Sequence, residues 1–254
     1  MPISSLASPT IFLTFAGRAL PWLAGLTAGV CGLGLYLAFF VAPADYQQGE
    51  TVRIMFIHVP AAWLSMLIYM TMVLGALGSL VWRHPLADVA QKTAAPLGAA
   101  FTFVCLATGS LWGKPMWGAW WVWDARLTSV LVLFILYLGL IALWQTIEEP
   151  GRAAKAAAVL TLVGAINIPI IKFSVDWWSS LHQPASVLRI GGPAIHPAML
   201  WPLLIMSLGF TLLFATLQIM AVRNEILRRR LRRRAILAAA ENHAPAAARL
   251  ETVR

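Results

Sequence analysis

LTSVLVLFILYLGLIALWQTI, residues 127–147, is a run of 21 residues that carries no charge. About 20 consecutive apolar residues in a helix are enough to cross the roughly 30 Å of hydrocarbon in a bilayer. The run ends at the sequence EEPG, residues 148–151, which combines charge with two residues that interrupt helices. The stretch therefore predicts a transmembrane helix that ends close to residue 147.

Five further apolar runs lie on either side of this one. Together they predict six spans, at about Leu20–Val41, Ile57–Val81, Thr93–Trp112, Leu127–Ile147, between Lys155 and Lys172, and from after Gly191-Gly192-Pro193 to about Val222. The fifth has only 16 residues between its lysines, which is just short of the usual range of about 17–25. A re-entrant loop is the alternative at that position.

The composition is that of a membrane protein rather than a soluble one. Of the 254 residues, 60% are hydrophobic and only 11% are charged, whereas soluble domains carry about 25% charged residues. We expect an all-α fold, a polytopic membrane protein with six transmembrane helices. One membrane domain is expected over residues 1–225, followed by a basic C-terminal tail over residues 226–254.

The distribution of Lys and Arg predicts the orientation of the chain. Six spans put both termini on one side with loops 82–92 and 148–155, and that side holds 14 of the 19 Lys and Arg residues. Positive residues are retained on the cytoplasmic side, so both termini are expected in the cytoplasm. Loops 42–56, 113–126 and 172–196 then face outward, into the periplasm of a Gram-negative bacterium. Without the tail each side holds five such residues, so this orientation depends on the tail.

The net charge of +9 does not indicate nucleic-acid binding. Seven arginines between Arg223 and Arg234 follow directly after the last apolar run, a position typical of a segment attracted to anionic lipid. The sequence contains no Gly-rich phosphate loop, HExxH motif or Ser-His-Asp arrangement. We therefore expect membrane lipid but no nucleic acid as a partner, and neither a hydrolase nor an ATPase.

A tryptophan-rich stretch, WGKPMWGAWWVWDARLTS at residues 112–129, lies between the third and fourth runs and holds five of the chain's 12 tryptophans. After a break in residues 113–115, the i, i+3, i+4, i+7 spacing predicts a short amphipathic helix. Its face would be formed by Trp117, Trp120, Trp121 and Asp124. A flat aromatic face suits a planar apolar ligand, and an interfacial aromatic belt is the alternative. Asp124 is also placed to cap the fourth span.

Two histidines are expected at the same depth on the outer side. His58 lies in RIMFIHVPAAW at the start of the second run, and His182 lies in DWWSSLHQPAS of the last outer loop. Imidazole is a common ligand of transition metals and of haem iron, so two imidazoles across an aromatic shelf would suit a six-coordinate haem. The alternative is two ordinary polar groups at an interface. Arg53 and Arg126 lie on the same side and could bind haem propionates or anchor span ends.

A specific signature accompanies these histidines. Residues 117–124, WGAWWVWD, match all five specified positions of the WGxxWxWD signature of haem-handling proteins of cytochrome c biogenesis. Within that superfamily the chain resembles the CcmC family over about residues 20–225, on segments 53–63, 117–129 and 166–186. The resemblance implies a multi-pass protein of the bacterial inner membrane that presents haem b, bound transiently and non-covalently, at the periplasmic surface.

The resemblance also implies roles for individual residues. His58 and His182 would be the axial ligands of the haem iron, and His196 is an additional outer histidine that departs from the pattern. Arg53 and Arg126 would meet the propionates. The haem platform would consist of Trp117, Gly118, Trp120, Trp121, Trp123 and Asp124.

The partners implied by the resemblance belong to the same assembly system. Haem would pass to the haem chaperone CcmE, and CcmD and the transporter subunits CcmA and CcmB would associate with the chain. Because CcmE would carry the covalent bond in this step, the chain is expected to load haem rather than to act as an enzyme. A haem-translocating channel and an electron-transferring cytochrome b-type subunit are the alternatives.

Overall fold

Six long helical segments form the molecule in the computed structural model, which describes residues 8–178, 180–183, 186–187 and 189–243. Each is long and apolar enough to span a membrane. No β-strand occurs among these residues, so the expected all-α fold with six spans is confirmed. The end of the expected tail, residues 244–254, lies outside the described residues.

The helices follow the apolar runs but extend beyond most of them. Proline is the first residue of four helices, a position where the missing N–H breaks no hydrogen bond. In order, the elements are α2 (Pro9–Tyr36), which continues as a π-helical turn (Leu37–Val41), a 3-10 helix (Glu50–Ile54), α3 (Met55–Trp82), α4 (Pro85–Trp117), α5 (Ala125–Thr146), α6 (Pro150–Gly164), α7 (Asn167–Trp177) and α8 (Pro197–His243).

The core of the bundle lies between α3, α4, α5 and α6. Tyr69 and Tyr137 are its largest fully buried side chains, and their rings meet edge to face at a centroid distance of 5.4 Å. Glycines let the helices approach here, because a Cβ on Gly98 would overlap the Tyr137 ring and one on Gly164 would overlap Tyr69. Close approach through small residues is a common way for membrane helices to pack.

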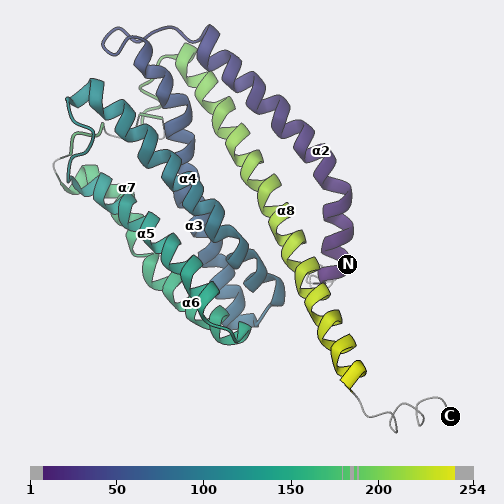
Figure 1. Ribbon diagram of the computed structural model, residues 1–254. Coiled ribbons are helices and arrows are strands. Elements are labelled where there is room, and N and C mark those ends of the chain that lie inside the picture. The colour runs from purple at the N-terminus through teal and green to yellow at the C-terminus, as the bar shows by residue number, and fades with distance from the viewer. Residues whose placement is uncertain (1–7, 179, 184–185, 188, 244–254) are drawn as a thin grey trace.

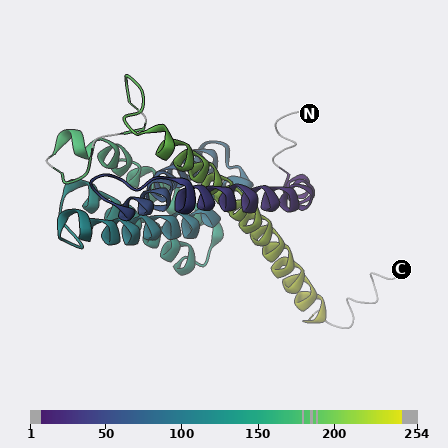
Figure 2. The same cartoon turned by 90° about the horizontal axis from the view of Figure 1, so that it is seen from above.

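The first and last spans form a pair at one side of this core. α2 packs chiefly against α8 (Figure 1), and Thr27 and Thr216 share a hydrogen bond of 2.9 Å between their hydroxyls. The C-terminal part of α8 extends beyond the other helices (Figures 1 and 2), and residues 227–240 are exposed throughout. The expected boundary between membrane domain and tail, at residue 225, therefore falls inside one continuous helix.

The fifth span is built from two helices. α6 ends at Gly164 and α7 begins at Asn167, and together they form one candidate span of 28 residues. This crossing is longer than the 16 residues counted in the sequence, because Lys155 and Lys172 lie within the helices rather than beyond their ends. Asn167 Nδ2 donates to the carbonyl of Ser129 at 2.8 Å and ties the interruption to α5.

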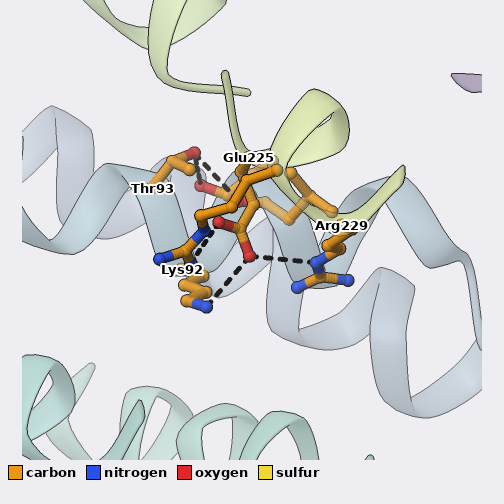
Figure 3. Close-up of polar contacts among 7 residues, drawn as sticks. Lys92, Thr93, Glu225 and Arg229 are labelled. Atoms are coloured by element: carbon orange, nitrogen blue, oxygen red, sulfur yellow. Dashed lines mark hydrogen bonds and ion pairs between the residues drawn. The ribbon is translucent and has the colours of Figure 1, made fainter. Parts of the chain in front are cut away.

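An ion cluster joins α4 to α8 close to the point where α8 leaves the bundle. Glu225 Oε1 accepts hydrogen bonds from Lys92 Nζ and Arg229 Nε, both at 2.9 Å (Figure 3), and Oε2 accepts one from Arg228. The Lys92 ammonium also lies 5.6 Å from the ring centroid of Trp144 in α5. Because Glu225 is buried, the cluster fixes α8 against the bundle.

Candidate functional site

His58 is held in a defined orientation in the first turn of α3. Its Nδ1 lies 3.0 Å from the carbonyl oxygen of Cys105 and 3.1 Å from Thr108 Oγ1, both in α4. A carbonyl oxygen can only accept a hydrogen bond, so Nδ1 carries the proton of the neutral imidazole. The lone pair is then on Nε2, which is the arrangement that a metal-binding histidine requires.

Close packing also fixes the plane of this ring. Gly109 faces it, and a Cβ at that position would lie 2.9 Å from His58 Cε1. The Trp112 ring meets it edge to face at 5.8 Å and 73°. Trp112 is itself held by a hydrogen bond from Nε1 to Gln48 Oε1 at 2.9 Å. The sequence did not single out Thr108, Gly109 or Trp112, because all three lie in α4 whereas His58 lies in α3.

The tryptophan-rich segment does not form the predicted amphipathic helix. α4 continues through Gly113 and Pro115 to Trp117 and ends at Gly118, whose φ of +73° is a left-handed helix terminus. α5 begins directly after Asp124. The seven residues 118–124, which lie between the end of α4 and the start of α5, are non-helical. The predicted break at 113–115 and the predicted shared helix face are therefore both wrong.

The tryptophans of this segment have different environments. Trp117 packs against His182 at a ring distance of 5.0 Å. Trp121 is half-buried and packs on Trp123 at 5.5 Å, and its Nε1 is buried without a hydrogen-bond partner among the described residues. Trp120 and Trp123 are exposed, at 55% and 75%. The tryptophans therefore do not share one face: Trp117 lies beside His182, whereas Trp120 and Trp123 face the surroundings.

Asp124 connects three parts of the site. The prediction that it caps the fourth span is confirmed, because its Oδ1 accepts from Leu127 N–H at 2.8 Å. Its Oδ2 accepts from Ser180 Oγ at 2.6 Å and lies 3.7 Å from His182 Nδ1. Burial alone would raise the pKa of this carboxyl, but the hydrogen bonds from Leu127 and Ser180 and the nearby imidazole lower it overall. Asp124 is therefore a carboxylate at neutral pH.

His182 lies in the segment between α7 and α8, whose described residues form bends and turns. Its backbone N–H donates to Ser180 Oγ at 3.1 Å. The side-chain Nδ1 is buried and makes no hydrogen bond to the described part of the chain. Burial lowers the pKa of this imidazole and outweighs the opposing effect of the Asp124 carboxylate, and the positive charge of Arg126 lowers it further. A neutral imidazole with an unsatisfied nitrogen is suited to bind a metal.

The two histidines belong to one cluster. An electrostatic interaction couples His58 with His182, and Asp124 and Arg126 interact electrostatically with His182. Arg126 Nε donates to Ser174 Oγ at 3.1 Å, and an Nη donates to the carbonyl of Lys172 at 3.3 Å. The structure thus brings together four of the residues predicted from separate parts of the sequence.

Arg53 and His196 have structural partners elsewhere. Arg53 Nη1 donates to the carbonyls of Ala38 and Ala42 at 2.7 and 3.2 Å, and Nε donates to Glu50. These bonds satisfy carbonyls at the end of the π-helical turn after α2. His196 Nδ1 accepts from Ala198 N–H at 3.2 Å, at the start of α8. Both contacts favour a role in ending or starting a helix.

The chemistry of the site fits a haem better than a bare metal ion. No group of three or more His, Cys, Asp or Glu ligands occurs in the described part of the chain. A haem brings four ring nitrogens of its own and needs only two axial ligands from the protein. The nearby indoles of Trp112 and Trp117 supply apolar aromatic surface, and Arg126 supplies a positive charge.

The sequence is similar to characterised proteins along most of its length. The family described as Heme exporter protein C (CcmC) matches residues 2–237. Heme exporter protein C of Bradyrhizobium diazoefficiens is 65% identical over 232 residues, which cover 91% of this chain and 88% of that protein. The Escherichia coli protein of the same name is 49% identical, with 89% and 91% covered. The one from Paracoccus denitrificans is 43% identical, with 96% and 100% covered.

Proposed function

The chain belongs to the CcmC family, heme exporter protein C, and from this premise we propose that it presents haem at its outer face and delivers it to a haem chaperone. The family places the chain in haem export for cytochrome c maturation. With six spans it is a multi-pass membrane protein, of the inner membrane in bacteria. The proposal adds the site, the mode of binding and the receiving partner.

The arrangement of His58 carries this proposal. Its Nδ1 proton is directed to the Cys105 carbonyl at 3.0 Å, so the ring offers Nε2 as a ligand at no further cost in reorganisation. His182, with its unsatisfied Nδ1 and lowered pKa, supplies the second imidazole. Bound haem b would be held non-covalently by this pair. The protein's own groups then bind and orient the haem without reacting with it, so we do not propose an enzymatic activity.

The tryptophans supply the apolar surroundings of the proposed site. Trp117 lies against His182 and Trp112 against His58, at 5.0 and 5.8 Å. Indole rings favour offset stacking on other π-systems and exclude water, which would otherwise compete for the iron. The unpartnered Nε1 of Trp121 leaves a hydrogen-bond donor available within the same segment. Gly118 contributes by ending α4 rather than by contacting the ligand.

The positive charge for the haem propionates comes chiefly from Arg126. Its guanidinium lies in the electrostatic environment of His182 and Asp124, and guanidinium groups bind carboxylates in a bidentate manner. Arg53 is less suited, because two of its bonds go to the carbonyls of Ala38 and Ala42. We therefore assign Arg53 to the structure of the outer end and Arg126 to the ligand.

The proposed receiver is CcmE, with CcmD, CcmA and CcmB as associated subunits. Imidazole ligands exchange more readily than a covalent link, so a ligand from the chaperone can replace one of the two histidines. With both termini in the cytoplasm, the site faces the periplasm, where such a chaperone would act. The basic part of α8, which includes Arg228–Arg230, then lies next to anionic lipid on the other side.

Visible absorption spectra of the purified protein and its histidine variants test the site. Wild type with added haem is expected to give a sharp low-spin Soret band. His58→Ala and His182→Ala should each retain haem with an altered spectrum, and the double variant should lose it. His196→Ala serves as the matched control, because its Nδ1 bonds to Ala198, and it should resemble wild type. Full low-spin haem in the double variant would exclude the ligand assignment.

The two alternative functions have less support. In the other half of the bundle, the buried Gln91 side chain donates from Nε2 to Thr161 Oγ1 at 2.8 Å, which favours a role in packing α4 against α6 over one in lining a channel. An electron-transferring cytochrome b subunit usually holds haems at two levels of the membrane. A redox titration that finds two haems per chain would support that function instead.

A further inference from the structure

We propose that Ser180 and Asp124 form a latch that positions His182, and that His182 is the ligand released during transfer while His58 stays in place. This inference rests on the proposed function, because it divides roles between the two axial ligands. It adds Ser180, which no sequence motif indicated, as a positioning residue. The observations concern how differently the two imidazoles are held.

His58 is held rigidly. It lies in a regular helix, its Nδ1 has two polar partners in α4, and Gly109 and Trp112 confine its ring. Rotation of this ring would break the contact with Cys105 O, and the ring lies so close to Gly109 that no side chain fits between them. Movement of His58 therefore requires α3 and α4 to separate, and these two helices share the most extensive packing in the bundle.

His182 is held by far fewer contacts. It lies outside the helices, and its ring has Trp117 as a neighbour and the Asp124 carboxylate 3.7 Å from its Nδ1, a distance longer than a hydrogen bond. Its backbone N–H is the group that is fixed, through Ser180 Oγ at 3.1 Å. The position of His182 therefore depends on Ser180, which holds its backbone, and on Asp124, which lies beside its ring.

Ser180 is in turn fixed by Asp124. Its hydroxyl donates to Asp124 Oδ2 at 2.6 Å while accepting from the His182 N–H. The other carboxylate oxygen accepts from Leu127 N–H at 2.8 Å, in the first turn of α5. A relay of hydrogen bonds thus runs from a rigid helix terminus to the backbone of His182. One hydroxyl group is the bridge in this relay.

The latch is strong enough to hold the segment and weak enough to open. A hydrogen bond to a charged acceptor changes an equilibrium by about 10- to 100-fold, and Asp124 keeps its hydrogen bond from Leu127 N–H when the one from Ser180 opens. Opening would move His182 away from the site without disturbing α3 or α4. A chaperone ligand could then take the vacated axial position while His58 still holds the iron.

The test uses Ser180→Ala in the full-length protein in detergent. Ser180→Thr keeps a hydroxyl and should behave as wild type. Ser186→Ala is the matched control, since it makes the same change in the same segment and leaves the Asp124 contact intact. The first measurement is the rate of cleavage by trypsin without haem. Arg189 is exposed and is the only tryptic site between Lys172 and the start of α8. The rate of cleavage after Arg189 therefore reports opening of the segment.

The second measurement is haem dissociation, followed spectroscopically with excess apomyoglobin as the acceptor. We expect Ser180→Ala to raise both the cleavage rate and the dissociation rate by about 10-fold or more, with a larger high-spin fraction in the spectrum. Combining it with His182→Ala should add little, whereas combining it with His58→Ala should add to the effect.

Each other outcome has a distinct meaning. Equal cleavage in Ser180→Ala and Ser186→Ala would overturn the latch itself. Faster cleavage with unchanged haem dissociation would keep the latch but overturn the role of His182 as the released ligand. A wild-type protein that binds no haem would overturn the proposed function together with this division of roles, while the cleavage rates would still decide whether Ser180 holds the segment.

Discussion

Replacing Gly109 with alanine is expected to displace the His58 ring, although the change adds a single methyl group. The new Cβ would lie 2.9 Å from His58 Cε1, whereas non-bonded carbons prefer about 3.5–4.0 Å. The ring must therefore move by about 0.6–1 Å. A movement of that size lengthens the 3.0 and 3.1 Å contacts of Nδ1 with Cys105 O and Thr108 Oγ1 past the range of a hydrogen bond.

The magnitude follows from three contributions. Losing hydrogen bonds costs about 1 kcal/mol each, and an extra methyl in a packed interior costs about 1–3 kcal/mol. The better helix propensity of alanine returns up to about 1 kcal/mol. We expect Gly109→Ala to lower the free energy of unfolding by about 2–4 kcal/mol, which corresponds to about 4–16 °C in melting temperature for a chain of this size.

Thermal unfolding in detergent measures this change, with Gly139→Ala as the control. Nothing lies within 4 Å of a Cβ at position 139, so that variant gains helix propensity without a collision. The haem spectrum of Gly109→Ala should also gain a high-spin component, because Nε2 moves with the ring. A melting temperature for Gly109→Ala equal to or above that of Gly139→Ala, with an unchanged spectrum, would refute the packing argument.

Three further predictions concern contacts outside the ligand pair. Glu225→Gln removes the anion of the cluster around Lys92 but keeps a hydrogen-bonding side chain, and should lower the free energy of unfolding by about 1–3 kcal/mol. A double-mutant cycle with Lys92→Met should show that the two effects are not additive. In Arg53→Lys, the lysine side chain cannot reach the carbonyls of both Ala38 and Ala42 at the end of the π-helical turn. This substitution should lower the melting temperature by a few degrees, equivalent to about 1 kcal/mol. The lowered pKa of Asp124 means that its stabilising effect is present above about pH 4 and is lost as the pH falls below that value. The unfolding free energy of wild type should therefore fall more steeply below about pH 4 than that of Asp124→Asn.

The spans and one helix cap could be predicted because they depend on neighbours in the sequence. A charge-free run such as residues 127–147 needs no tertiary contact to favour a membrane helix. Asp124 reaches a backbone N–H only three residues ahead, so its capping role is also local. The same reasoning was wrong for the tryptophans, because their helical spacing was counted across Gly118, whose backbone conformation ends α4.

The internal organisation of the site could not be predicted in the same way. Thr108 lies 50 residues from His58, and Ser180 lies 56 residues from Asp124. Nothing in the local sequence marks either hydroxyl, since serine and threonine are common wherever helices end or meet. Arg53 was assigned to propionates because of its side of the membrane, but it donates to Glu50 and to the backbone carbonyls of Ala38 and Ala42 at the end of the π-helical turn, and no sequence pattern indicated these carbonyls.

The pairing of α2 with α8 has a consequence for how the chain is made. Thr27 and its partner Thr216 are 189 residues apart, and a ribosome that adds about 5–20 residues per second needs about 10–40 s to cover that distance. During that interval the first span resides in the bilayer without its partner, while α3 and α4 can already pair as a hairpin. The first span can remain in the bilayer without a partner helix, since Arg18 is its only charged residue. The order of synthesis thus leaves the α2 side of the bundle open until the last helix arrives.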